Sequence, residues 1–277
     1  MTPDEYCQQK AAASGSSFYY SFLFLPPERR RAITALYAFC REVDDVVDET
    51  QEPQLAASKL AWWRAELANL FAGHPQHPVT RALQPHLAAR SITQEKLNEI
   101  IDGMEMDLMQ TRYLDWPGLE RYCYRVAGVV GLLAAGIFGY RNARTLDYAR
   151  NLGIAFQLTN IIRDVGEDAR KNRIYLPVQD LQQFAVPASD ILNAKQTAEF
   201  GRLMAFEAAR ARTHYESAMQ ALPREDRKAQ RPGLIMAAIY RTLLDEIERD
   251  GFRVLAQRTS LTPLRKFWIA WRTWITA

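Results

Sequence analysis

Apolar residues recur at helical spacing along most of the chain. After Pro26-Pro27, apolar and aromatic positions fall three or four residues apart, on one face of a helix. This rhythm predicts a helix over about 28–49, with proline at its start. The same pattern predicts further helices near 54–72, 93–113, 117–138, 142–168, 189–220, 231–252 and 262–275.

Strand signals are scarce, because no sustained alternation of apolar with polar residues and no Asn-Gly or Asp-Gly hairpin is found. The sequence therefore predicts an all-α fold. No internal repeat or low-complexity linker divides the chain, and Gly73–Pro78 is predicted to be a short surface loop. We accordingly expect a single domain over residues 1–277.

Composition is that of an ordinary soluble protein, with 48% hydrophobic and 24% charged residues. The net charge of +3 does not call for nucleic acid and suits a small anionic substrate. Cys7, Cys40 and Cys123 are odd in number and widely spaced, which argues against a disulfide framework. Met1–Lys10 is too polar for a secretory signal, and Val126–Tyr140 is shorter than the roughly 20 residues of a membrane-spanning helix. We expect a cytoplasmic protein, at most peripheral at the inner membrane.

Two acidic clusters are the strongest candidates for chemistry. On a helix, Asp44 and Asp48 lie one turn apart on one face, and so do Asn160, Asp164 and Asp168 over two turns. Like charges at this spacing repel, so each stripe favours a bound cation. Oxygen ligands without histidine or thiolate suit Mg²⁺. A lone stripe of this kind is usually a solvated helix face, and only its surroundings change that interpretation.

Further polar residues share the faces of these stripes. Tyr37 and Arg41 precede the first stripe at helical spacing, and Gln157 and Arg163 accompany the second within an otherwise apolar segment. Burying so many polar groups without partners would be costly. A cleft that holds metal ions and a diphosphate would satisfy them.

Three other segments each allow two interpretations. Arg170–Arg173 follows the second stripe and is either a phosphate-binding run or a solvated loop. Ser14–Ser17 either binds an anion or simply begins a helix. Gly128 and Gly131 lie inside a helical pattern, where glycine costs about 1 kcal/mol, so a neighbouring helix or an isoprenoid chain must come close to the backbone.

Taken together, these segments resemble the squalene and phytoene synthase family of head-to-head prenyltransferases. Four blocks in the family's order and spacing carry the resemblance: Ser14–Phe18, Tyr37–Asp48, Tyr122–Gly131 and Gln157–Asp168. The resemblance implies an isoprenoid-synthase-type helical bundle around a central apolar cavity. It also implies a substrate that is an isoprenoid diphosphate.

The resemblance assigns roles to individual residues. It implies that magnesium, directly or through diphosphate, is bound by Asp44, Asp48, Asn160, Asp164 and Asp168. It implies catalytic roles for Tyr37, Arg41, Tyr122, Arg163 and Tyr240. It implies substrate binding by Ser14, Ser17, Phe18, Tyr37, Arg41, Gln157, Arg163 and Arg173.

Within the family, Ser14–Arg31 and Cys40–Glu49 most resemble bacterial presqualene diphosphate synthases of the hopanoid route. We therefore expect two farnesyl diphosphates to be joined to presqualene diphosphate without NADPH, for downstream squalene-forming enzymes. Phytoene synthase, dehydrosqualene synthase and complete squalene synthase share the same motifs and stay open as alternatives.

Two classes of helical protein outside the family are further alternatives. A helical metal-storage or di-iron protein would need Glu-x-x-His pairs, and no histidine here follows a glutamate by three residues. A helical interaction protein would need no metal, and its binding would survive Asp44→Asn combined with Asp164→Asn.

The segment Leu264–Trp274 combines aromatic residues with Arg265, Lys266 and Arg272. It is either an amphipathic helix packed on the core or a helix that lies in a membrane interface.

Overall fold

The structure is a computed structural model that describes residues 1–13, 18–22, 24–50 and 52–276. Within these ranges the chain forms helices joined by turns, and the only extended pairing is an isolated bridge between Arg112 and Ile174. The predicted all-α class is confirmed.

The fourteen α-helices of the described residues are α1 (Pro3–Ala13), α2 (Phe18–Phe22), α3 (Pro27–Glu49), α4 (Pro53–Phe71), α5 (Pro78–Leu83), α6 (Gln94–Met109), α7 (Trp116–Cys123), α8 (Val129–Phe138), α9 (Arg144–Arg170), α10 (Val178–Gln183), α11 (Ala188–Leu192), α12 (Ala198–Ala221), α13 (Arg231–Arg249) and α14 (Pro263–Thr276). A π-helical segment, η3 (Tyr124–Gly128), joins α7 to α8. Short 3₁₀ turns cover Gln84–His86, Ala88–Arg90, Arg224–Asp226 and Arg253–Leu255.

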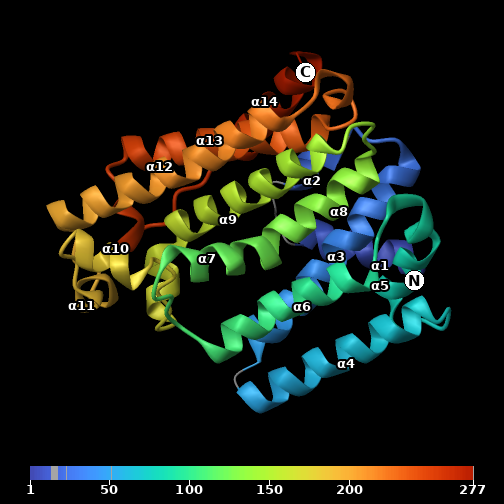
Figure 1. The fold of residues 1–277 in the computed structure, drawn as a ribbon, viewed down its shortest axis with the longest axis horizontal. Helices are drawn as coiled ribbons and strands as arrows, with labels where there is room; N and C mark the ends of the chain where they lie inside the picture. Colours follow the sequence, from blue (N-terminus) through green and yellow to red (C-terminus); the bar gives the residue numbers. More distant parts are fainter. Residues whose placement is uncertain (14–17, 23, 51, 277) are drawn as a thin grey trace.

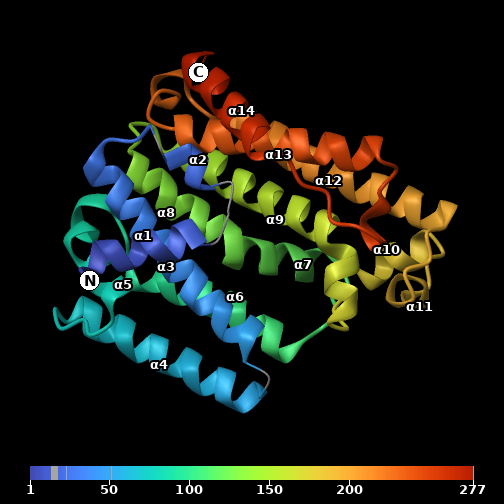
Figure 2. The same cartoon turned by 180° about the vertical axis from the view of Figure 1, so that it is seen from behind.

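The helices are arranged in two halves around α8 and α9 (Figures 1 and 2). One half contains α1, α3, α4, α5 and α6, and the other contains α12, α13 and α14. Each half has its own buried apolar cluster, and Phe18, Tyr124 and Val126 pack against both clusters. The boundary between the halves is where the candidate site residues gather.

Close backbone contact fixes α8 against α9. A Cβ atom added at Gly131 would lie 2.3 Å from the carbonyl oxygen of Ala149, and one at Gly153 would lie 2.3 Å from that of Ala127. Larger side chains would push the two helices apart. The expectation that glycine here admits a neighbouring helix is therefore confirmed.

One helical stretch of the described chain, Trp116–Phe138, is long and apolar enough to cross a bilayer. It comprises α7, η3 and α8, and it packs against α6 and α9 in the middle of the bundle. Its apolar character therefore also fits the interior of the protein.

Most predicted helices are confirmed within a few residues, but two kinds of error occurred. The short helices α1, α2, α5 and α10 were not predicted. The helix predicted over 189–220 is wrong as a single element, because α11 ends at Leu192 and α12 begins only at Ala198. The intervening Ala194 has a positive φ of 52°, and the Thr197 side chain accepts a hydrogen bond from Phe200 N and so starts the new helix.

Candidate active site

An apolar cavity lies between the two halves, as predicted. Its walls come from α2, α3, α8, α9 and α13, through residues such as Phe18, Leu36, Val130, Phe156 and Met236. A cavity walled almost entirely by carbon can exclude water from a reactive intermediate and accept a long hydrocarbon chain.

Polar groups from two facing helices reach this cavity. Tyr37 of α3 and both Gln157 and Asn160 of α9 contribute to its lining. The Asn160 amide donates to Gln157 Oε1 at 3.4 Å, while its own Oδ1 is buried without a hydrogen-bond partner among the described residues. Because an orphaned buried carbonyl is costly, Asn160 is suited to bind a ligand atom or a cation.

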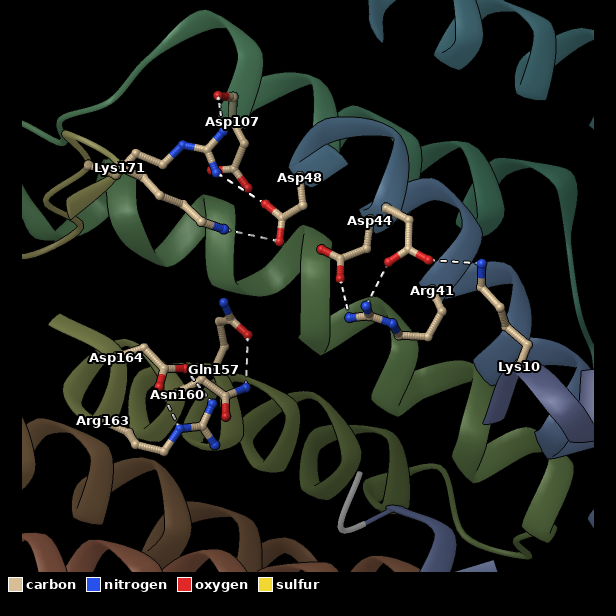
Figure 3. Close-up of polar contacts among 12 residues, drawn as sticks. Lys10, Arg41, Asp44, Asp48, Asp107, Gln157, Asn160, Arg163, Asp164 and Lys171 are labelled. Carbon is tan, nitrogen blue, oxygen red and sulfur yellow. Dashed lines mark hydrogen bonds and ion pairs between the residues drawn. The ribbon is translucent and has the colours of Figure 1, made fainter. Parts of the chain in front are cut away.

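The first acidic stripe lies on α3 above these groups (Figure 3). Arg41 donates to Asp44 at 2.5 Å and to Asp45 at 2.6 Å, and Lys10 of α1 pairs with Asp45 at 2.8 Å. Burial raises the pKa of Asp44 to about 6, and Asp48 adds to the rise while Arg41 opposes it. Negative charge on this stripe is thus only partly compensated.

The basic run after α9 lies against the same stripe. Arg173 pairs with Asp48 at 3.4 Å and Lys171 does so at 3.6 Å. Both ion pairs are long, and Asp48 is half-exposed. The run Arg170–Arg173 is therefore not only a solvated loop, since two of its side chains face the predicted metal ligands.

The second stripe, on α9, is held more tightly. Asp164 accepts from Arg163 Nε at 2.7 Å and from Arg258 Nε at 2.8 Å, and Arg258 lies beyond α13. Burial alone would raise the pKa of Asp164, but the hydrogen bonds from Arg163 and Arg258 outweigh it and lower the pKa below its usual value. One turn on, burial and the charge of Asp164 raise the pKa of Asp168 to about 7.

Figure 3 shows the two stripes facing each other, with Asp44 and Asp48 on one side and Gln157, Asn160 and Asp164 on the other. The structure therefore brings together the residues that the spacing rule selected on two helices more than one hundred positions apart.

A buried carboxylate that the sequence did not reveal lies beside the stripes. Asp107 of α6 accepts hydrogen bonds of 2.8 Å from the hydroxyls of both Tyr122 and Tyr175. Arg173 contacts its main-chain oxygen at 3.5 Å. Burial raises the pKa of Asp107 to about 6 although the two tyrosines oppose the rise. Tyr122 is thus held beside the acidic stripes by Asp107 and is not part of the cavity lining described above.

Two of the predicted aromatic residues, Phe18 and Tyr37, line the cavity, and Tyr240 packs behind its lining. Phe18 has its ring centroid 5.7 Å from that of Tyr37 and 6.5 Å from that of Tyr240. Tyr240 also packs on Phe156, at 4.9 Å between centroids. Ser14 and Ser17, predicted to bind substrate, lie outside the described residues.

The family of the chain follows from its similarity to known proteins. A profile of the squalene/phytoene synthase family matches residues 11–265. The chain belongs to the squalene/phytoene synthase family. It is 35% identical to a 15-cis-phytoene synthase of Synechocystis over 99% of this chain and 85% of that protein. It is 36% identical to one of Synechococcus elongatus over 95% of this chain and 89% of that protein.

Solved structures of the family superpose on nearly the whole chain. A dehydrosqualene synthase has a TM-score of 0.86 at 28% identity and covers 98% of this chain and 95% of its own. Squalene synthase HpnC from Alicyclobacillus acidocaldarius has a TM-score of 0.81 at 29% identity, covering 90% and 94% respectively. The isoprenoid-synthase bundle expected from the sequence is confirmed.

Family membership makes the chain a prenyltransferase of the kind that joins prenyl diphosphates head to head. The di-iron and interaction-protein alternatives are therefore wrong.

The donor set of this family member fits a hard divalent cation, because the stripes offer only carboxylate and amide oxygens. Among the described residues, however, no three Asp, Glu, His or Cys side chains stand close enough to hold one ion by themselves. An ion placed between the stripes would need further oxygen ligands from a bound molecule or from water. A diphosphate supplies such oxygens.

Proposed function

We propose that the protein condenses two farnesyl diphosphates to presqualene diphosphate. The observation that carries the proposal is that the two acidic stripes adjoin the apolar cavity. Tyr37 on α3 and both Gln157 and Asn160 on α9 also line this cavity. A diphosphate at the stripes would leave its prenyl chain in contact with hydrocarbon only.

Three features support the farnesyl chain and the presqualene product. The segments Ser14–Arg31 and Cys40–Glu49 resemble bacterial presqualene diphosphate synthases. Two solved relatives that match over at least nine-tenths of the chain are named for squalene and dehydrosqualene, which are built from two farnesyl units. The cavity is also lined, away from the stripes, by the bulky side chains of Phe138 and Tyr148, which favours the shorter farnesyl chain.

The proposed metal is Mg²⁺, with Asp44, Asp48, Asn160, Asp164 and Asp168 as its ligands together with the diphosphate. When bound, magnesium neutralises charge that develops on the leaving diphosphate. Arg41, Arg163 and Arg173 already point their guanidinium groups at these carboxylates, and Arg258 joins them at Asp164. The same cations can donate to diphosphate oxygens and so stabilise the leaving group.

The carbon chemistry takes place against the aromatic wall. The C1–O bond of the first substrate breaks, and the diphosphate leaves with the electron pair. The allylic cation lies near Phe18, Phe156 and Tyr240, whose ring faces stabilise positive charge without forming a bond to it. The C2=C3 double bond of the second substrate attacks C1, and loss of a C1 proton to the released diphosphate closes the cyclopropane ring onto C3. The products are presqualene diphosphate, diphosphate and one proton.

Incubation of the purified enzyme with farnesyl diphosphate and Mg²⁺, with and without NADPH, tests the proposal. Mass spectrometry should show presqualene diphosphate in both reactions and no product after chelation of the metal. Squalene or dehydrosqualene as the sole product would refute the presqualene assignment while leaving head-to-head condensation intact.

Phytoene synthesis is the second candidate, because the curated relatives reported above are phytoene synthases at 35–36% identity. A competition between farnesyl and geranylgeranyl diphosphate separates the two. We expect the farnesyl substrate to be consumed first. If phytoene forms and farnesyl diphosphate is left unused, the second candidate is correct.

A further inference from the structure

The helix α14 exposes a row of large apolar side chains to its surroundings. Leu264, Trp268, Trp271 and Ile275 follow one another at intervals of four, three and four residues, which aligns them on one face. Their exposed fractions are 83%, 54%, 50% and 59%. Phe267, at the edge of the same face, is 49% exposed. We refer to these five residues as the α14 stripe.

Side chains outside the stripe hold the helix in place. Ile269 and Ala270 are its buried residues, and α14 packs mainly against α13. Trp274 stacks on Phe24 with centroids 5.0 Å apart and lies beneath Arg231. The core-packing interpretation of this segment therefore holds for Ile269, Ala270 and Trp274, while the α14 stripe stays outside the core. A soluble surface helix normally buries such a stripe.

The charges of α14 have one sign. Its sequence carries Arg265, Lys266 and Arg272 and no acidic residue. Arg272 lies over the ring of Trp268 at 5.4 Å, and Arg265 is tethered to Glu246 of α13 at 2.7 Å. Cations that flank an exposed row of tryptophan and aliphatic side chains are the pattern of helices that lie in the interface of an anionic membrane.

We propose that α14 docks the protein on a lipid bilayer with anionic headgroups, with the α14 stripe in the headgroup region. Tryptophan prefers this region because its ring is apolar and its N–H is polar. A second copy of the chain fits the face less well. A symmetric pair would bring Arg265 and Arg272 of one copy towards the same cations of the other, since such interfaces use the same patch twice.

The position of α14 also suits a membrane-facing enzyme. Trp274 lines a second pocket, which shares Phe138 and Pro232 with the apolar cavity. At its other end, burial together with the charges of Arg163 and Arg258 lowers the pKa of Lys266, so this helix also passes near the second stripe. The docking surface thus lies close to the apolar cavity and to the second stripe.

Vesicle flotation with the full chain tests the proposal without any turnover, so its result does not depend on the product assigned above. The probes are vesicles of phosphatidylcholine alone and of phosphatidylcholine with phosphatidylglycerol. The wild type should float with the anionic vesicles. Trp268→Gln combined with Trp271→Gln should reduce partitioning about a hundredfold, because burial of each large apolar side chain contributes about tenfold. Arg272→Gln should reduce it about fivefold.

The matched control is Trp62→Gln combined with Leu114→Gln. Both residues are exposed to a similar degree or more, at 49% and 74%, but lie outside α14. This variant should float like the wild type. Leu264→Gln combined with Ile275→Gln is a second test of the stripe if the tryptophan variant fails to fold. Circular dichroism and retained turnover of soluble substrate verify the fold of each variant.

The proposal is overturned if the wild type floats with neither vesicle, or if both stripe variants float as well as the wild type. Equal flotation with neutral and anionic vesicles would overturn the headgroup assignment. If the wild type binds no vesicles but sediments as a dimer, and only the stripe variants sediment as monomers, the α14 stripe is covered by a second copy of the chain instead.

Discussion

The two acidic stripes have the same four-residue spacing but differ in how their charge is compensated. On α3, Asp48 is half-exposed and meets Arg173 and Lys171 only at 3.4 and 3.6 Å. On α9, Asp164 is largely buried and clasped by Arg163 and Arg258 at 2.7 and 2.8 Å. Asp164 is thus fixed by hydrogen bonds before any ligand binds, whereas Asp48 is held only by weak, solvent-screened pairs, although Arg41 binds Asp44 of the same helix at 2.5 Å.

This difference shows that identical spacing does not give identical roles. Tight hydrogen bonds lower the pKa of Asp164, while burial raises that of Asp44 to about 6. Asp164 keeps its charge through its arginine partners, whereas the proposed metal ion would favour the charged form of Asp44. Asp107 lies close enough for its charge to raise the pKa values of both Asp44 and Asp168.

Neutralising one carboxylate in each stripe should have the largest effect. Asp44→Asn and Asp164→Asn should each lower kcat by about 10²–10³-fold, because each removes charge that stabilises the leaving diphosphate. The double variant should lose much less than the product of the two factors, since the stripes act as a unit. Single-turnover kinetics measure this, with Asp190→Asn, which alters a pair with Lys195 on α11, as the control. Fully multiplicative losses would mean that the stripes do not share one diphosphate.

The backbone contact that positions the α9 stripe can be broken separately. Gly153→Ala places a Cβ 2.3 Å from Ala127 O and should lower the free energy of unfolding by about 2–3 kcal/mol, as overpacking does. Gly201→Ala on α12 is the control, since no atom lies within 4 Å of its added Cβ. It should raise stability by about 0.5–1 kcal/mol through helix propensity. Urea unfolding measures both, and equal changes would contradict the close packing of η3 on α9.

The two tyrosines on Asp107 offer a matched pair next to the α3 stripe. Both hydroxyls donate at 2.8 Å, so Tyr122→Phe and Tyr175→Phe should cost similar stability, about 1.5–2 kcal/mol each. Their activities should differ, because only Tyr122 carries a proposed catalytic role. We expect kcat to fall about 10–100-fold for Tyr122→Phe and less than about threefold for Tyr175→Phe. Equal losses of kcat would show that Tyr122 acts only as a structural partner of Asp107.

The sequence predicts those features of the fold and of the site that depend on local periodicity. Spacing by four places Asp44 and Asp48 on one face of α3 whatever surrounds them, so the stripes could be found. Arg258 meets Asp164 across 94 positions, and Asp107 stands among other acidic residues of α6. Neither contact leaves a local pattern, because it arises only when distant helices pack.

The remaining errors have the same origin. The helical rhythm of apolar residues runs across 193–197, so it hid the turn in which Thr197 starts α12. On α14 the pattern correctly indicated an amphipathic helix. Periodicity defines an apolar face but does not state which face points inward, and tertiary packing placed the apolar stripe outside.

Among substitutions in the two stripes, Asp48→Asn should change the stability of the protein least. It is therefore the most sensitive test of the difference between the stripes. Its ion pairs are long and half-exposed, which limits their contribution to less than about 0.5 kcal/mol. Asp164→Asn, in contrast, leaves Arg163 and Arg258 without their shared carboxylate and should cost about 2 kcal/mol. Unfolding in urea at low and high salt separates the two, because added salt should erase the Asp48 effect and leave most of the Asp164 effect. If both variants lost the same stability, the α3 stripe would be as organised without ligand as the α9 stripe, and the arrival of the metal and diphosphate would no longer be needed to complete it.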